Sequence, residues 1–245
     1  MTEKRLHTQE PLAVGKHVTL AEDRARYIGR VLRLRPDDLL TLFDGTGGEF
    51  QARILSFSRD AAELEVLQHF DNDAESPLDI HLLQGISRGE RMDFVIQKAT
   101  ELGVRRITPV MTDYGVVKLD AGRALKKTAH WNGVAISSCE QCGRNRVPKI
   151  DEPVALRNWM GEHLHGDDMR LVMKPGSSGS LRDISAVDRP VTVLIGPEGG
   201  FSDTEYDLAD ATGFEPLAFG PRTLRTETAA VAIIAALQAL HGDCR

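Results

Sequence analysis

From residue 78 onward, short apolar runs alternate along the chain with longer segments of helical spacing. Leu78–Leu83, Arg106–Met111 and Val191–Ile195 are runs of this kind. The last of them is apolar with almost no alternation, which is typical of a strand buried on both faces. Between the runs, segments such as 92–102 and 121–140 repeat apolar residues every three to four positions. This alternation predicts an α/β fold in which helices cover a mostly parallel sheet.

Residues 1–73 have the pattern of a small β-rich domain. Val18–Leu20 and Asp38–Phe43 are apolar enough for short strands, and segments 50–57 and 62–70 alternate apolar and polar residues. A period of two is typical of antiparallel strands with one buried face. Because the strands are short and glycine-rich turns join them, a small barrel is predicted.

One helix is predicted inside this front domain, at Glu22–Leu34, where apolar residues recur at helical spacing. The polar, acidic segment Asp71–Pro77 follows the last strand and ends in proline, so it is predicted to be a linker. We therefore expect two domains, at 1–73 and 77–245.

The formal net charge of −6 argues against a protein that coats nucleic acid through bulk charge. It leaves room for a local basic surface, because phosphate contacts act within about 8–10 Å. Arginines crowd residues 24–35, and Arg and Lys crowd 144–149, although each stretch can also be read as a solvated face. The sequence shows neither an apolar signal core nor a run of roughly 20 apolar residues, so we expect a cytosolic protein.

The three cysteines, Cys139, Cys142 and Cys244, are too few for a disulfide framework. Cys139 and Cys142 have the spacing of a metal or redox motif. A structural zinc site needs four ligands, and no second pair of Cys or His accompanies this one. We therefore expect two reduced thiols near a helix end and no metal site.

Two glycine-containing loops, Gly196–Gly200 and Gly220–Glu227, follow consecutive predicted strands. Loops at the carboxyl ends of parallel strands are where open α/β sheets bind ligands. Glycine lets the backbone approach a ligand closely and adopt positive φ, although tight turns alone also use it. Neither loop matches the dinucleotide fingerprint or the phosphate loop of nucleotide hydrolases. The residues alone thus predict a small-molecule site of unknown ligand.

Two further features belong to the same region. Ser202 and Glu205 have the spacing of a capping box, which predicts a helix start just after the first loop. The predicted helix at 228–240 carries Ala, Val, Ile and Leu around its circumference, so it must be buried on all sides. We expect it in the core or at a subunit interface, and we favour the interface.

Five segments carry a more specific pattern when they are read in order: Ser87–Asp93, Gln97–Gly103, Cys139–Pro148, Leu194–Ser202 and Phe219–Thr228. Together they resemble the ribosomal small subunit methyltransferase E family, which belongs to the SPOUT class of RNA methyltransferases. The resemblance spans nearly the whole chain. It implies a PUA-like barrel followed by a SPOUT α/β domain that dimerises and contains a C-terminal trefoil knot.

The resemblance also implies an activity. Members of the family transfer the methyl group of S-adenosylmethionine to N3 of one uridine, at position 1498 of 16S rRNA. The implied partners are 16S rRNA in the small ribosomal subunit and a second copy of the chain, with no membrane and no metal. The residues that match the donor site of the family are Met173, Lys174, Pro175, Ile195, Gly196, Glu198, Gly200, Phe219, Gly220 and Leu224.

A mechanism follows from this implied substrate. Uridine N3 carries a proton and is a poor nucleophile until that proton is lost, so the site must favour the anion. Arg225 is the candidate for stabilising the charge, and Glu227 or Glu140 for accepting the proton. Alternatively, Arg225 and Glu227 form a structural ion pair. The candidates for contact with RNA phosphates are Arg5, Arg30, Arg33, Arg88 and Arg144.

Two alternative functions are open at this point. One is a SPOUT methyltransferase that acts on tRNA or on another rRNA position, because the choice of target depends on surface shape. The other is a non-catalytic RNA-binding factor for ribosome assembly. The two glycine loops argue against the second, since a binding protein has no need of a donor pocket.

Overall fold

The structure is a computed structural model that describes residues 4–164, 166–184 and 186–244. The chain forms two compact units. The N-terminal unit consists of the residues up to Glu75 together with Cys139–Val147, and the C-terminal unit contains the remainder. The domain boundaries expected from the sequence, 1–73 and 77–245, stay a prediction. They do not anticipate that a nine-residue segment from the second half of the chain joins the first unit.

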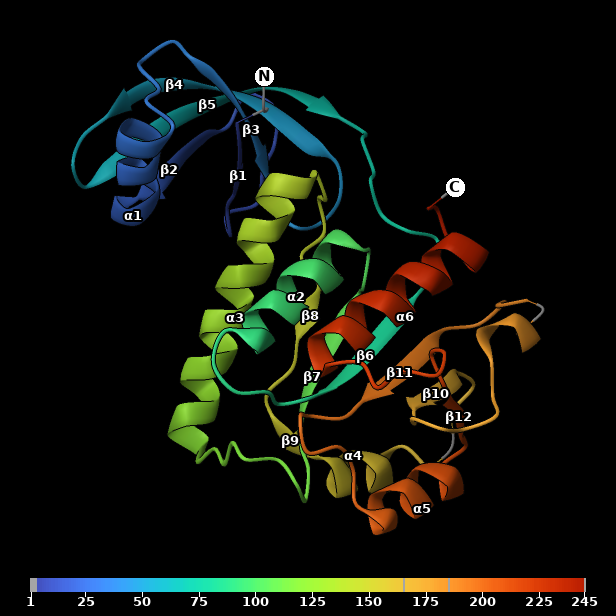
Figure 1. Cartoon of the computed structure of the whole chain (residues 1–245). Coiled ribbons are helices and arrows are strands. Elements are labelled where there is room, and N and C mark those ends of the chain that lie inside the picture. Colours follow the sequence, from blue (N-terminus) through green and yellow to red (C-terminus); the bar gives the residue numbers. More distant parts are fainter. Residues whose placement is uncertain (1–3, 165, 185, 245) are drawn as a thin grey trace. The chain divides into compact units, whose positions relative to one another are not determined.

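The N-terminal unit is built on one curled five-stranded sheet with the order β1-β3-β4-β5-β2 (Figure 1). Its elements are β1 (Arg5–His7), β2 (His17–Ala21), α1 (Glu22–Arg26), the π-helical turn η1 (Tyr27–Val31), β3 (Leu39–Phe43), β4 (Glu49–Phe57) and β5 (Ala61–Phe70). The pair β1 and β3 is parallel and the other pairs are antiparallel. Alternate residues of the long strands, such as Ile54 and Leu64, enter a shared apolar core.

The predicted helix at 22–34 is only partly regular. It begins as the α-helix α1, continues as η1 and ends at Val31. Ala25 and Ile28 are buried, as the spacing predicted. Arg33 then adopts a left-handed conformation with φ of 54°, and Leu34 N donates a closing hydrogen bond to Ile28 O at 3.1 Å.

Two buried arginines connect segment 139–147 to the rest of its unit. Arg5 pairs with Glu49, and its Nη2 donates to Asn145 Oδ1 at 2.5 Å. The Nη2 of Arg144 lies 2.5 Å from Glu75 Oε2, and both side chains are at most 5% exposed. RNA contact by Arg5 and Arg144 stays a prediction, and these pairings do not favour it. A guanidinium that is buried and matched to a carboxylate holds its own fold together and presents no charge to a phosphate.

The C-terminal unit is an α/β layer structure on a parallel sheet with the order β12-β10-β11-β6-β7-β8, and β9 also pairs with β7. Its strands are β6 (Ile80–Gly85), β7 (Arg106–Met111), β8 (Lys149–Ile150), β9 (Val154–Ala155), β10 (Met169–Met173), β11 (Val191–Ile195) and β12 (Phe214–Leu217). Its helices are α2 (Arg91–Glu101), α3 (Ala121–Cys142, whose last turn belongs to the other unit), α4 (Leu156–Glu162), η2 (Leu181–Asp183), α5 (Asp203–Ala211) and α6 (Thr226–His241).

Helices cover both faces of this sheet, as the sequence pattern predicted. On one face, α2 and α6 lie side by side, and on the other α4 and α5 do (Figure 1). Leu194 packs with Trp159 and Phe214 in the core beneath α4 and α5, whereas its neighbour Val193 points to the opposite face. Every residue of β11 is buried. The run 191–195 therefore forms the doubly covered strand that its composition indicated.

Local signals in the sequence mark the ends of two helices. Gly103 ends α2 with φ of 82°. Glu205 N donates to Ser202 Oγ and Ser202 N donates to Glu205 Oε2, which is the predicted capping box. Segment 154–162 begins with the short strand β9, and α4 follows it directly. The trefoil knot stays a prediction.

Candidate active site

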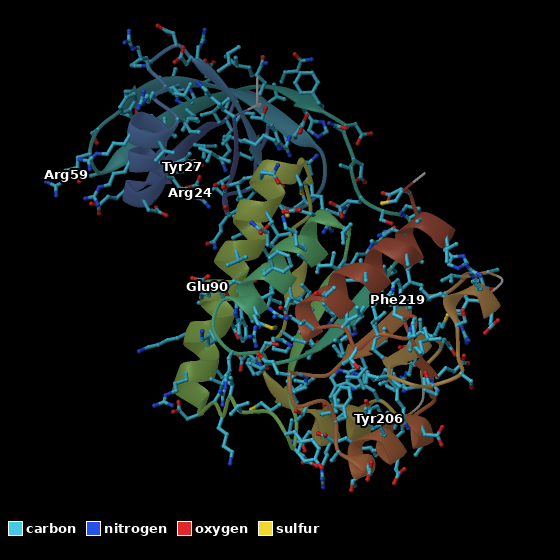
Figure 2. The ribbon with its side chains drawn as sticks, viewed as in Figure 1. Arg24, Tyr27, Arg59, Glu90, Tyr206 and Phe219 are labelled. Carbon is cyan, nitrogen blue, oxygen red and sulfur yellow. The ribbon has the colours of Figure 1, made fainter. Side chains whose placement is uncertain are left out.

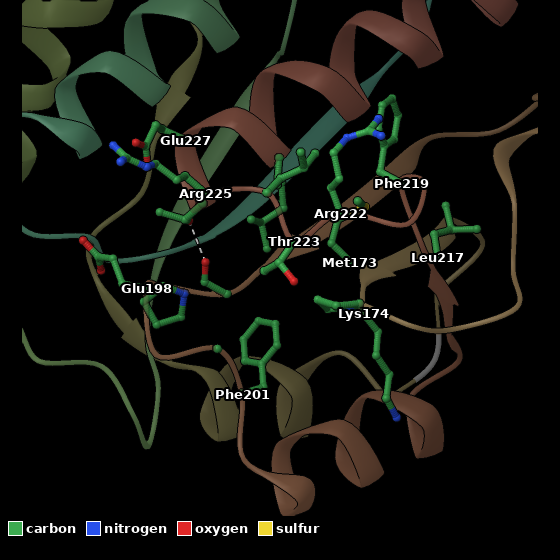
Figure 3. A pocket seen from close by; sticks show the side chains of 18 of the residues that line it. Met173, Lys174, Glu198, Phe201, Leu217, Phe219, Arg222, Thr223, Arg225 and Glu227 are labelled. Carbon is green, nitrogen blue, oxygen red and sulfur yellow. Dashed lines mark hydrogen bonds between the residues drawn. The ribbon is translucent and has the colours of Figure 1, made fainter.

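A cavity of about 510 Å³ lies at the carboxyl ends of β10, β11 and β12 (Figure 3). Three segments that follow these strands form its walls, near 173–175, 195–201 and 217–229. The volume is within the range of about 300–1,000 Å³ that is common for small-molecule sites. All ten residues expected at a donor site line it: Met173, Lys174, Pro175, Ile195, Gly196, Glu198, Gly200, Phe219, Gly220 and Leu224.

Glycine is required at two places in the wall that follows β11. Gly200 has φ of 70°, a conformation that other residues rarely adopt. A Cβ at Gly196 would lie 3.2 Å from the Gly200 Cα and 3.3 Å from the Phe201 ring. The loop therefore folds tightly back on itself, and this keeps side chains out of that part of the cavity.

A short chain of hydrogen bonds joins two walls of the cavity. Gln84 Nε2 donates to Thr226 Oγ1 at 2.9 Å, and Thr226 Oγ1 donates to Gly196 O at 2.6 Å. Gln84 and Thr226 are both buried. Because Thr226 is the first residue of α6, this chain fixes the start of the last helix against the loop after β11.

Glu198 lies at the mouth of the cavity and has two donors on the segment before α2. Its Oε1 accepts from Arg91 Nη1 at 2.5 Å and from the backbone N–H of Arg88 at 3.1 Å. Partial burial on its own would raise the pKa of Glu198. The backbone N–H groups of Glu198 and Arg88 and the Arg91 guanidinium outweigh it, so the pKa lies below its ordinary value. Glu198 is thus an anion held by a cation.

Glu227 lies deeper, and its two oxygens have different surroundings. Oε1 is 4.0 Å from Arg91 Nε, whereas Oε2 is buried and has no hydrogen-bond partner among the described residues. The side chain is 16% exposed. A buried carboxylate oxygen without a donor is costly, so it is poised to accept a proton or a hydrogen bond from a ligand.

Arg225 also lines the cavity, and its side chain is exposed (Figure 3). It makes no ion pair within 4.0 Å with any carboxylate in the described ranges. The structural ion pair between Arg225 and Glu227 that the sequence left open is therefore not present, and Arg91 is the arginine nearest to Glu227.

Lys174 directs its ammonium group to the rim of the cavity. Its Nζ lies 4.5 Å from the centre of the Tyr206 ring, at the distance of a cation–π contact. Burial raises the pKa of the Tyr206 hydroxyl, and the Glu205 carboxylate adds to this, so the ring stays neutral. Tyr206 in turn packs edge-on against Phe201 at 5.4 Å. Lys174 and these two rings form one side of the site.

Several lining residues were not predicted: Arg91, Pro197, Phe201, Tyr206, Leu217, Arg222, Thr223, Thr226 and Ala229. Some of them could have been predicted from the sequence, because Arg91 and Phe201 belong to segments that carry the family resemblance. Tyr206 gave no signal, since it enters the wall only through the packing of α5.

The structure does not bring Glu140 into this cavity. Glu140 belongs to the N-terminal unit, where its Oε1 accepts from the His7 backbone N–H at 3.0 Å and from Arg24 Nη1 at 2.8 Å. The other three RNA candidates, Arg30, Arg33 and Arg88, are exposed.

The cysteines at the end of α3 are free, and Cys139 is buried. Burial raises the pKa of the Cys139 thiol to about 12, so it is not a nucleophile at neutral pH. Within residues 4–164, 166–184 and 186–244, no group of three His, Cys, Asp or Glu side chains is arranged to hold a metal ion. No helix in these ranges is long and apolar enough to span a bilayer.

Comparison with known proteins gives this site a context. The profile of an RNA methyltransferase domain matches residues 74–238, and that of an RNA methyltransferase PUA domain matches residues 20–67. A putative methyltransferase from Legionella pneumophila, solved with bound SAM, superposes with a TM-score of 0.94 at 39% identity, over 99% of this chain and 100% of that one. The fold and the site are those of an RNA methyltransferase with an N-terminal PUA domain.

Relatives with known names show to which family of RNA methyltransferases the chain belongs. Ribosomal RNA small subunit methyltransferase E of Buchnera aphidicola is 37% identical over 98% of this chain and 97% of its own length. The Neisseria gonorrhoeae protein of the same name, crystallised with S-adenosyl methionine, has a TM-score of 0.92 and 39% identity over 99% of this chain and 100% of its own. The chain belongs to the ribosomal RNA small subunit methyltransferase E family.

Proposed function

We propose that this protein transfers the methyl group of S-adenosylmethionine to N3 of the uridine at position 1498 of 16S rRNA. One observation carries the proposal. The ten residues that the family resemblance places around the methyl donor come from three separate loops, and all of them line one cavity. Two proteins that are 39% identical to this chain were crystallised with this donor.

The residues present are suited to a ligand with a flat apolar end and a polar end. Phe219, Leu224 and Met173 offer an apolar surface for the adenine. The tight loop at Gly196 and Gly200 has no side chain at these positions, so the protein backbone can approach the ligand closely. When bound, S-adenosylmethionine supplies an electrophilic methyl group on a sulfonium, which leaves as a neutral thioether.

The chain's own residues have to make uridine N3 nucleophilic. We infer that Glu227 accepts the proton of uridine N3, because its Oε2 is buried in the cavity wall with no donor among the residues that the structure describes. Arg225 lies on the same wall and pairs with no carboxylate of residues 4–164, 166–184 and 186–244, so it is free to stabilise negative charge on the oxygens of the uridine ring. Glu140 is the less favoured acceptor, because Arg24 and the His7 backbone already occupy its Oε1.

The remaining parts of the proposal concern the partners. Arg30, Arg33 and Arg88 are proposed to contact RNA phosphates, since all three are exposed. A homodimer is proposed through the partly exposed side of α6 that carries Val231, Ala232, Ala235 and Ala236. The compartment proposed is the cytosol, where small ribosomal subunits are assembled.

The test is nucleoside mass spectrometry and primer extension on 16S rRNA from cells that lack this gene. Methylation at N3 blocks Watson–Crick pairing, so it stops reverse transcriptase at the modified position. The stop at position 1498 is expected to vanish in the deletion strain. It should return when purified protein and S-adenosylmethionine are added to small subunits from that strain. If it persists in the deletion strain, the target lies at another rRNA or tRNA position, or the protein binds RNA without modifying it.

A further inference from the structure

Tyr114 is an exposed aromatic residue in the loop that follows β7. It is 57% exposed, which makes it the most exposed of the three tyrosines in the chain. Tyr27 lies on η1 in the N-terminal unit, and Tyr206 lies on α5 in the wall of the donor cavity (Figure 2). Among residues 4–164, 166–184 and 186–244, no aromatic ring packs on Tyr114. Its ring is therefore not a part of the core.

The backbone of Tyr114 packs directly against the loop after β11. A Cβ at Gly199 would lie 2.8 Å from Tyr114 O and 2.9 Å from Tyr114 Cβ. Gly199 does not have the positive φ of Gly200, so this close contact, and not the backbone conformation, excludes a larger residue there. Because Glu198 and Gly200 line the cavity on either side of Gly199, Tyr114 lies just outside the cavity mouth.

The residue before Tyr114 is anchored as well. Asp113 N donates to Glu205 Oε1 at 2.9 Å. The carboxylate of Asp113 accepts from Ser202 Oγ at 2.7 Å and from Arg157 Nη2 at 2.8 Å. Ser202 and Glu205 are the capping box of α5, so the loop after β7 is tied to the helix that follows the glycine loop. An exposed ring is thus carried by a backbone that is held in place on two sides.

Cationic side chains lie at the same mouth. Glu198 accepts hydrogen bonds from the backbone N–H of Arg88 and from the Arg91 guanidinium. The Arg88 side chain is exposed, and that of Arg91 is 44% exposed. Proteins hold unpaired RNA with this combination, in which cations contact the backbone and an aromatic ring stacks on a base. The ring of Tyr114 is the part of the combination that the mouth of the cavity offers to a base.

We propose that the ring of Tyr114 stacks on the uracil of the target uridine and holds it over the mouth of the donor cavity. The inference rests on the proposed function and adds the residue that contacts the base. Uridine N3 lies on the Watson–Crick edge, so the protein reaches it only when the base is unpaired and turned out of its stack. An aromatic ring at the mouth replaces the stacking that the base has lost. It leaves N3 accessible, because stacking covers the face of a base and not its edge.

Tyr114→Ala in the full-length chain tests this contact. Alanine keeps the Cβ that packs on Gly199, so the melting temperature and the Kd for S-adenosylmethionine should not change. The single-turnover rate on saturating small subunits from the deletion strain should fall about tenfold, because the uridine is turned out for less of the time. The Kd for the subunits should change by less than about threefold, since phosphate contacts supply most of the affinity. Tyr114→Phe retains the ring and should recover most of the lost rate.

Leu164→Ala is the matched control. Leu164 is 53% exposed and precedes β10, so it lies at the amino ends of the strands, whereas the cavity lies at their carboxyl ends. Its replacement removes a similar apolar surface and should leave the rate at the wild-type value.

Tyr114→Trp reports the stack directly. Stacking on a base quenches the fluorescence of an indole ring, and the two tryptophans of the wild-type protein, Trp131 and Trp159, are buried. The extra emission of the variant over the wild type should therefore fall when small subunits bind.

Two results would overturn the inference: a wild-type rate in Tyr114→Ala, or extra emission from Tyr114→Trp that saturating subunits do not quench. Failure of the proposed function looks different. In that case the wild-type protein itself transfers no methyl group to position 1498, while the emission of Tyr114→Trp still decides whether a base stacks at the mouth of the cavity.

Discussion

The hydroxyl of Thr226 donates a hydrogen bond of 2.6 Å to the carbonyl oxygen of Gly196, and this bond joins the start of α6 to the loop after β11. The two residues are 30 positions apart in the sequence. Gln84 donates to the same hydroxyl, so the bond is part of a buried chain rather than a surface contact. The shape of the donor cavity therefore depends on a residue that need not touch the donor.

Replacing Thr226 by Val tests this dependence. The variant leaves Gly196 O without its donor and reduces Gln84 Nε2 to its bond with Gly85 O, which should lower the free energy of unfolding by ~1–3 kcal/mol. The Kd for S-adenosylmethionine should rise about tenfold, because the loop loses its fixed position. Calorimetric titration and urea unfolding measure the two effects. Thr226→Ser retains the hydroxyl and should keep both values close to wild type, and similar losses in the two variants would contradict the proposed role of the bond.

Glu227→Gln should separate binding from chemistry. The amide keeps the size of the side chain but cannot accept the N3 proton, so we expect kcat to fall by roughly a hundredfold or more. The Kd for S-adenosylmethionine should stay within about twofold, and single-turnover methylation of small subunits reports the rate. Glu215→Gln, an exposed change on β12 outside the cavity, is the control. If Glu227→Gln methylates at the wild-type rate, Glu227 is not the proton acceptor, and Glu140 is again the candidate.

Arg91 is expected to act on donor binding through Glu198. Arg91→Gln should raise the Kd for S-adenosylmethionine about tenfold, because Glu198 loses the cation that holds it at 2.5 Å. Glu198→Gln should do the same, and the double variant should bind little worse than either single one, since both remove one interaction. Arg91→Lys retains the charge and should recover part of the affinity. Fully additive losses would show that the two residues act separately.

The stability of the C-terminal unit should fall as the pH drops from about 6.5 to about 4. Burial, together with the nearby Arg106, lowers the pKa of His81 from 6.5 to about 4 in the folded state. The unfolded chain takes up a proton on His81 below its unfolded pKa and the folded chain does not, so acid favours unfolding across this window. This shift in the pKa of His81 corresponds to a loss of ~3 kcal/mol in the free energy of unfolding near pH 4.

His81→Gln should flatten that part of the stability curve, because glutamine does not titrate. It can also retain a hydrogen bond to Thr108 Oγ1, which lies 2.7 Å from His81 Nε2 in the wild-type protein. Urea unfolding at several pH values between 4 and 7 provides the comparison. If the free energy of unfolding falls equally with pH in the variant and the wild type, a group other than His81 controls the loss of stability in acid.

Much of the fold could be predicted because its signals are local. The apolar run 191–195 predicted a strand covered on both faces, and the spacing of Ser202 and Glu205 predicted the start of α5. The walls of the cavity were predicted as well, since each wall is a continuous segment with a recognisable pattern. What the sequence could not show was contact between distant segments, such as Arg91 with Glu198 or Thr226 with Gly196.

Charge was the least informative signal. Arg5 and Arg144 have the same sequence character as Arg30 and Arg33, yet the first two are buried against carboxylates and the last two are exposed. Nothing in the order of residues near Arg5 reveals that Glu49 and Asn145 will meet it in space. The burial of a charged side chain depends on its partner, and that partner can be 140 positions away.

The membership of segment 139–147 in the N-terminal unit affects the order of events during synthesis. Domains generally fold as units while the chain emerges from the ribosome, the first one before the second is complete. Here the last strand of the N-terminal unit ends at Phe70, but the partners of Arg5 and Glu75 arrive only with Asn145 and Arg144. The N-terminal unit therefore cannot be completed until more than half of the chain has been translated, when residues 76–138 of the other unit have already been synthesised.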